Sequence, residues 1–272
     1  TSQREADGKV RYKASVRSPD NGNVYAVDGM LSELSPRALN TGTLTAKLPL
    51  ASVFGGLMPR EARSRPPRGT ESIDLTATIN SDLDGARLTD LAFAFEQEGR
   101  PQLVNGELIA NWRNGLRVET RLASRWLDLD QIVAPEAGRK ASPMDTVRRL
   151  IGQASLLLPR DGTSLVTFDV DQVNLGGEAL SGVKLALARA GGLTSIGEFR
   201  AALPGGARGE LRGMLGSSAS AGPGPAVAAA PGDPVSDTFE GDVVLRGAGY
   251  QRFATWVGAD GVFAAATAKD TK

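Results

Sequence analysis

The chain has 272 residues, enough for one or two domains, and its 31 Lys and Arg balance its 31 Asp and Glu. Without net positive charge, the chain has no overall attraction for nucleic acid, so we do not expect nucleic acid as a partner. It has no Cys and no His. This composition excludes thiol nucleophiles, histidine bases, disulfides and the usual zinc sites. We therefore predict that the chain is not an enzyme and has neither a metal site nor a cofactor.

The longest apolar runs, such as 226–230 and 262–266, fall far below the roughly 20 residues that a membrane-spanning helix needs. The sequence begins at Thr1, without Met or a signal-like segment, so we interpret it as part of a longer protein. Its lack of Cys suits an oxidising compartment. We expect residues 1–272 to form a single domain.

Hydrophobic residues recur at every second position in about a dozen short runs, which is the pattern of strands with one wet face. In chain order these runs include 10–16, 73–79, 91–95, 116–122, 166–170 and 239–245. Turn signals rich in Gly, Asp and Asn separate them, at 20–22, 84–85, 114–115, 161–162, 176–177, 191–192 and 204–206. The sequence therefore predicts a mainly β fold built mostly of antiparallel hairpins.

Two stretches have helical spacing instead. Ser142 can cap a helix whose first residue is Pro143. Apolar residues then follow at steps of three and four until Pro159, which predicts a helix over 143–158 lying on the sheet or closing its end. A shorter helix is predicted near 250–257.

Two segments lack both patterns. The basic, Pro-rich segment 57–70 cannot pair inside a sheet, and we interpret it as a solvated connection rather than as a contact for lipid head groups. The segment 216–237 consists almost entirely of Gly, Ala, Ser and Pro. We expect a flexible insertion there that carries no chemistry.

One loop resembles a calcium site at its start. Residues 80–85 place oxygen ligands at the first, third and fifth positions and Gly at the sixth. The twelfth position, where a bidentate acid belongs, is Leu91. An Asp-Gly hairpin turn is therefore the preferred interpretation.

Four acidic residues, Asp128, Asp130, Asp169 and Asp171, alternate in or beside strands. A glycosidase could use two such carboxylates. Alternation also places them on the wet face of a sheet, and the chain has only three Trp and three Tyr to form a carbohydrate platform. We therefore interpret the four as surface residues.

Amphipathic strands with so few helices imply either two stacked sheets or one sheet curled around an apolar groove. Periodicity alone favours the packed sandwich. The motifs of the second half of the chain favour the groove through a family resemblance.

These motifs are a Gly-Gly turn at 176–177, Leu-Pro-Gly-Gly at 203–206 and Gly-Met-Leu at 213–215, each placed between strand patterns. Their order resembles the C-terminal portion of AsmA-family proteins, which are related to TamB-like proteins. The resemblance extends to Phe-Glu-Gly at 239–241, to the segment 250–258 and to Leu-Asp-Leu-Asp at 127–130. It covers residues 126–258.

The resemblance implies an elongated, strongly twisted antiparallel sheet curled into an open groove. It also implies a periplasmic protein of Gram-negative cells, anchored in the inner membrane through a segment outside this sequence. Such a protein would support outer-membrane biogenesis by holding or conducting phospholipid acyl chains, with other envelope proteins as further partners.

Five groove-lining residues are predicted on neighbouring strands, and their polar neighbours Asp169 and Lys184 should point outward. The five are Val166, Phe168, Val170, Leu185 and Leu187. The alternatives are a β-sandwich module for adhesion or partner binding and, less favoured, a carboxylate glycosidase.

Overall fold

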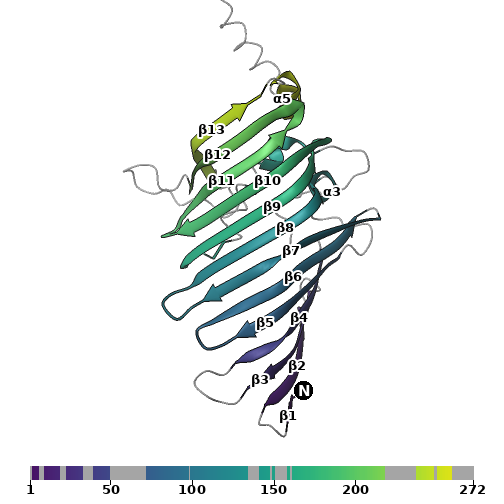
Figure 1. Ribbon diagram of the computed structural model, residues 1–272, viewed down its shortest axis with the longest axis vertical. Coiled ribbons are helices and arrows are strands. Elements are labelled where there is room, and N and C mark those ends of the chain that lie inside the picture. Colours follow the sequence, from purple (N-terminus) through teal and green to yellow (C-terminus); the bar gives the residue numbers. More distant parts are fainter. Residues whose placement is uncertain are drawn as a thin grey trace, which may run out of the picture.

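The computed structural model describes residues 2–5, 9–18, 23–32, 39–49, 72–97, 99–133, 141–147, 149–150, 158–159, 161–217, 237–247 and 250–258. Thirteen strands in this part of the chain form one open sheet, and their spatial order is their order in the sequence (Figure 1). The strands are β1 (Ser2–Arg4), β2 (Val10–Arg17), β3 (Val24–Leu31), β4 (Asn40–Pro49), β5 (Ser72–Ser81), β6 (Gly85–Gln97), β7 (Arg100–Asn111), β8 (Arg117–Asp128), β9 (Thr163–Leu175), β10 (Glu178–Ala190), β11 (Leu193–Leu203), β12 (Ala207–Ser217) and β13 (Asp237–Arg246). The predicted mainly β fold is confirmed.

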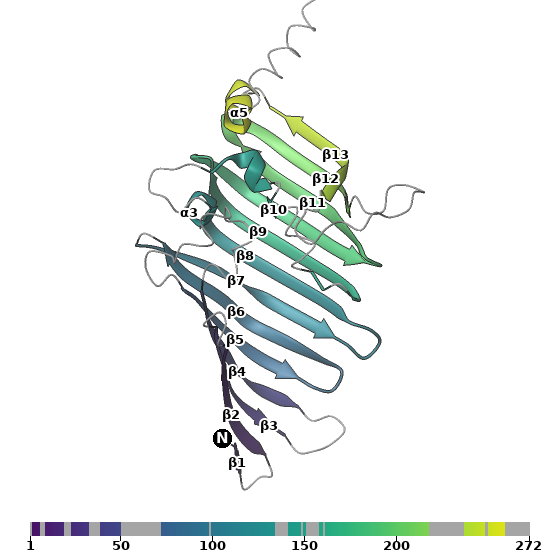
Figure 2. The same cartoon turned by 180° about the vertical axis from the view of Figure 1, so that it is seen from behind.

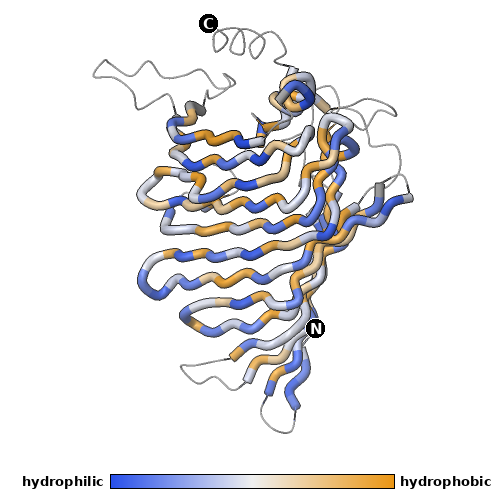
Figure 3. Tube along the Cα trace, turned by 45° about the horizontal axis from the view of Figure 1, so that its top comes forward, coloured by the Kyte–Doolittle hydropathy of each residue, from blue (hydrophilic) through white to orange (hydrophobic). Residues whose placement is uncertain are grey.

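The sheet is strongly twisted, so that the first strands are turned relative to the last ones (Figures 1 and 2). Along most strands hydrophobic and polar residues alternate (Figure 3). In β5, for example, Ile73 and Ala77 are buried while Asp74 and Thr76 are exposed. Because successive strand residues point to opposite faces, this alternation gives the sheet one apolar and one polar face.

β8 and β9 form the one parallel pair among the described strands, with Arg117 opposite Thr163. All other neighbouring strands are antiparallel, as predicted. A hairpin cannot join parallel strands, so the chain must return from the end of β8 to the start of β9 through residues 129–162. The sequence predicted a helix in this segment, but not that the segment is a crossover.

The described residues confirm the start of the predicted 143–158 helix. Residues 143–147 and 149–150 are helical, the carbonyl of Ser142 accepts a 2.9 Å hydrogen bond from the backbone N–H of Thr146, and Leu158 is buried. Residues 151–157 lie outside the described part. Before this helix the chain forms the short helix α3 (Leu129–Val133), which the sequence analysis did not predict. The shorter helix predicted near 250–257 is confirmed as α5 (Tyr250–Val257).

The predicted insertion is shorter at both ends than expected. Gly216 and Ser217 belong to β12 and pair with Thr238 and Asp237 of β13. The expected boundaries were wrong because backbone hydrogen bonding extends both strands into the Gly- and Ser-rich sequence. The remainder, 218–236, and the basic segment 57–70 lie outside the described residues.

Candidate functional site

The apolar face is continuous across the whole sheet. One row of directly opposed residues can be followed through every strand pair: Ser2, Tyr12, Gly29, Gly42, Ile79, Leu88, Leu108, Thr120, Val166, Leu187, Ile196, Gly213 and Gly241. Opposed residues in paired strands point to the same side. Apart from Ser2 and Thr120, each member of the row is hydrophobic or glycine, so the strands together present one apolar surface.

The five predicted groove residues lie together on this apolar face. Phe168 is directly opposite Leu185, and Val166 is directly opposite Leu187. These four side chains are half-buried. Val170 is 1% exposed and belongs to the main hydrophobic core, so the structure places it beneath other side chains rather than on an accessible surface.

Sequence reasoning missed the part of the face that follows Val170. Val173 is also buried and lies in the same core cluster, although a step of three residues separates the two. Gly182, between their partners Val183 and Leu180 on β10, has a φ of 58°, a backbone conformation that suits glycine. The departure from period two at this point could not be read from alternation alone.

Two helices, α3 and α5, cover the apolar face at one end of the strands (Figures 1 and 2). We call this end, where β8 ends and α3 begins, the helix end. Ile132 and Val133 of α3 are buried in the core cluster, and Trp256 of α5 packs against it. The indole N–H of Trp256 donates a 2.8 Å hydrogen bond to the carbonyl of Leu175 at the end of β9. The helix end is therefore a packed core.

Asp128 and Asp130 are not surface residues of the sheet, and this part of the prediction was wrong. Asp128 is 6% exposed, and its carboxylate accepts a hydrogen bond from the backbone N–H of Gln131 in α3. The carboxylate of Asp130 accepts hydrogen bonds from the backbone N–H groups of Gly176 and Gly177, both at 2.7 Å. Strand alternation failed here because the chain turns into α3 at residue 129. Both carboxylates therefore accept hydrogen bonds from backbone N–H groups and have a structural role.

The apolar face is most accessible near the two edges of the sheet. In β2 Val16 is 65% exposed, and in β13 Val243 is 67% exposed. Tyr25 and Leu31 of β3, on the same face, are also exposed. The apolar face therefore leaves hydrophobic side chains exposed at both edges of the sheet.

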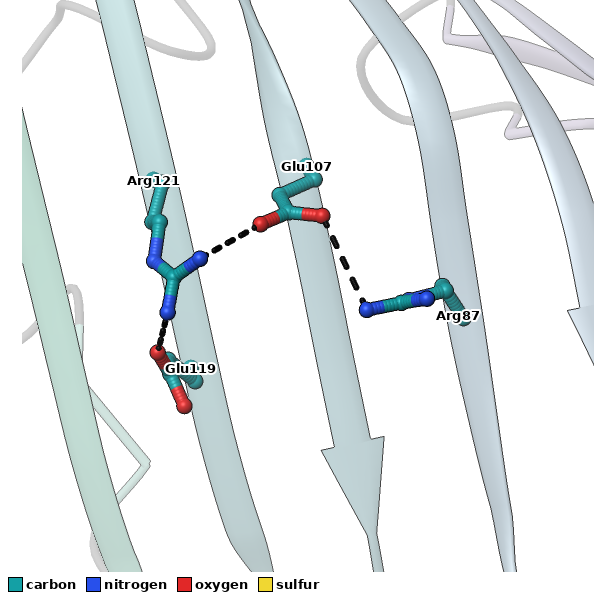
Figure 4. Close-up of polar contacts among 4 residues, drawn as sticks. All are labelled: Arg87, Glu107, Glu119 and Arg121. Atoms are coloured by element: carbon teal, nitrogen blue, oxygen red, sulfur yellow. Dashed lines mark hydrogen bonds and ion pairs between the residues drawn. The ribbon is translucent and has the colours of Figure 1, made fainter.

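The opposite face is polar and carries ion pairs between neighbouring strands. Glu107 of β7 lies between Arg87 of β6, at 3.9 Å, and Arg121 of β8, at 3.0 Å, and Arg121 also contacts Glu119 (Figure 4). Asp169 and Lys184 lie on this face, as expected, and form a 3.1 Å ion pair across β9 and β10. Exposed pairs of this kind add little stability but keep the face wetted.

Two open hollows lie on the polar face, not on the apolar one. One, of about 980 Å³, lies over β2 to β4 and is lined by side chains that include Arg11, Lys13, Asp28 and Thr43. A hydrogen bond from Lys13, together with the positive charges of Lys13 and Arg11, outweighs desolvation and holds the pKa of Asp28 below its ordinary value. The other hollow, of about 580 Å³, borders the ion pairs around Arg121.

The loop 80–85 forms a turn closed by its own carboxylate. Oδ1 of Asp82 accepts hydrogen bonds from the backbone N–H groups of Asp84, at 2.8 Å, and Gly85, at 2.9 Å. These contacts are those of an Asx-type turn. Among the residues that the structure describes, no group of three acidic side chains is placed to hold a metal ion.

No family model matches the chain, and neither a curated protein nor a solved structure matches it. Of the helices in the described ranges, none is long and apolar enough to cross a bilayer. The resemblance to AsmA-family proteins therefore stays a prediction.

Proposed function

We propose that this chain is an AsmA-like periplasmic protein that holds or conducts phospholipid acyl chains along the apolar face of its sheet. In this proposal a segment outside the sequence anchors it in the inner membrane, and the protein supports outer-membrane biogenesis with other envelope proteins. The observation that carries the proposal is the row from Tyr12 to Gly241, in which every residue except Thr120 is hydrophobic or glycine.

Acyl chains suit this face because it offers extended hydrophobic area without a directional polar site. Burial of each CH₂ group of an acyl chain contributes about 0.8 kcal/mol. Thirteen strands at their usual spacing span roughly 58 Å, which is well beyond the thickness of the hydrocarbon core of one bilayer. A surface of this length can hold several lipids in series.

The alternatives receive less support. All described strands belong to one sheet, so the packed sandwich that an adhesion module would need is not the architecture of this part of the chain. Of the acids considered for a glycosidase, Asp128 and Asp130 bind backbone N–H groups and Asp169 pairs with Lys184. No observation favours sugar hydrolysis over these structural roles.

The test is mass spectrometry of lipids that co-purify with the 272-residue chain, and it uses two adjacent residues of β10. Leu185 lies on the apolar face and Ala186 on the polar face, and both are half-buried. Leu185→Asp should reduce bound phospholipid at least several-fold, because an unpaired charge on an apolar surface is costly. Ala186→Asp should leave the lipid content unchanged. Absence of phospholipid from the wild-type chain, or equal loss in both variants, would overturn the proposal.

A second measurement avoids the risk that Leu185→Asp unfolds the chain. A photoreactive amino acid at Leu187, on the apolar row, should cross-link to phospholipid in lipid vesicles. The same group at the adjacent Ala188, on the opposite face, should not. Cross-linking that is equal at both positions would contradict binding on the apolar face.

A further inference from the structure

The last strand, β13, is an edge of the sheet (Figure 1). It pairs with β12 over its full length, from Asp237 to Arg246, and no other described strand pairs with it. The unpaired side of an edge strand is a template for another strand. Val243, at the middle of β13, is the most exposed large hydrophobic residue among those described. β13 therefore combines backbone N–H and C=O groups that no described strand pairs with and an exposed apolar side chain.

The charges of β13 have poor partners inside the sheet. Glu240 lies directly opposite Met214 of β12, so no cation faces it across the strands. Arg246 lies directly opposite Arg208, and like charges in that arrangement are unfavourable. An additional strand that places an acid beside Arg246 and a cation beside Glu240 would give each of these charges a partner of opposite sign.

We propose that a second copy of this chain supplies this strand, through antiparallel pairing of β13 with itself across a two-fold axis at Val243. In this register Glu240 of each copy faces Arg246 of the other. Val243 faces its own counterpart on the apolar side, and Leu245 lies opposite Gly241, beside the ring of Phe239 that packs over this glycine. The strand is thus complementary to itself in charge at Glu240 and Arg246 and in hydrophobicity at Val243, as an isologous interface requires.

The pairing has a consequence for the apolar face. Because opposed residues of paired strands share a side, Val243 and Leu245 of the two copies would join the two apolar faces into one surface. The dimer does not depend on lipid. Failure of lipid binding and failure of dimerisation are therefore separate results.

A single introduced cysteine tests the register directly, because the natural chain has none. Val243→Cys places two thiols face to face across the axis, at a strand spacing that a disulfide can bridge. Mild oxidation should convert most of this variant to a covalent dimer. Val244→Cys, whose counterparts are offset by two residues, and Leu193→Cys, exposed on a hairpin of β10 and β11, should remain monomeric under the same treatment. Cross-linking of Val244→Cys instead, or equal cross-linking of all three variants, would overturn the proposal.

Charge exchange tests the same interface without cysteine, by analytical ultracentrifugation of the full chain. Glu240→Arg or Arg246→Glu alone should weaken dimerisation about tenfold or more, because each change creates two like-charge pairs. The double exchange should restore dimerisation to within about threefold of the wild type. Glu210→Arg, on the polar face one strand inward, makes the same charge change away from the edge and should have no effect. A wild-type chain that stays monomeric at its highest soluble concentration, or a double exchange that fails to rescue, would rule the interface out.

Discussion

Oδ1 of Asp130 accepts a 2.7 Å hydrogen bond from the backbone N–H of Gly176, which lies 46 residues further along the chain. The same carboxylate accepts the N–H groups of Gly177 and Ala141. Gly176 and Gly177 both have positive φ angles, so the turn exposes its N–H groups in the way that backbone anion sites do. Asp130 therefore holds together α3, the turn between β9 and β10, and Ala141, which lies just before the helical residues 143–147.

Replacement of Asp130 by Ala should lower the free energy of unfolding by about 2 kcal/mol, because three backbone donors lose a charged acceptor. Asp130→Asn keeps an amide oxygen as acceptor and should cost less. Asp171→Ala, at an exposed position of β9, is the control and should change stability by less than about 0.5 kcal/mol. Urea denaturation measures all three. Equal effects of Asp130→Ala and Asp171→Ala would show that the contacts at the turn are not important for stability.

Substitutions at Val170 and Val166 can distinguish the packed part of the apolar face from its accessible part. Val170 is fully buried at the helix end, whereas Val166 is half-buried on the open row. Val170→Ala should destabilise the fold by about 2 kcal/mol through lost burial and a cavity, and Val166→Ala by less than about 1 kcal/mol. Denaturant unfolding of the two variants makes the comparison. A larger loss at Val166 would mean that the exposed and packed regions have been assigned in reverse.

Gly106 tests the close approach of β7 and β8. A Cβ atom at this residue would clash with the backbone carbonyl oxygen of Arg121, which cannot move without distorting the strand. Gly106→Ala should therefore cost about 2 kcal/mol or more of stability. At Gly197 of β11 an added Cβ would meet only the carbonyl oxygen of Ala186, at 3.9 Å. Gly197→Ala should be nearly neutral, and thermal melting of both variants would reveal any departure from this order.

Asp28 should titrate below 3.8, its ordinary pKa, because Lys13 donates a hydrogen bond to its carboxylate. A carboxyl group whose pKa is lowered by folding stabilises the fold above its unfolded pKa, and this contribution is lost as the pH falls through the folded value. Lys13→Met should raise the pKa of Asp28, as followed by NMR of the carboxyl carbon. Lys47→Met, which removes the partner of Asp74 on other strands, should leave it unchanged. An Asp28 pKa that does not respond to the loss of Lys13 would contradict this origin.

Alternation and turn signals in the sequence were sufficient to predict the mainly β fold and its mostly antiparallel pairing. The partners Phe168 and Leu185 were placed on one face because period two holds without interruption in that part of β9 and β10. Where the period breaks, prediction failed. Leu88 and Leu91 lie on the same face although three residues separate their positions, because Asp90 has a φ of 51° and the register shifts there. Such a bulge, like the role of Asp130, depends on contacts with distant strands and helices.

The parallel pairing of β8 with β9 also affects the order in which the sheet can form. Strands joined by short hairpins pair through contacts close in sequence, whereas the β8–β9 pair must first close the segment 129–162. The strands joined by short hairpins, β5 to β8 and β9 to β12, can therefore pair early, and we expect the β8–β9 pair to form after them. Pulse-labelling hydrogen exchange during refolding should show protection in β6–β7 and β10–β11 before protection at the β8–β9 boundary. If β1 to β8 and β9 to β13 gain structure separately, the segment 129–162 between them is the natural place at which to divide the chain.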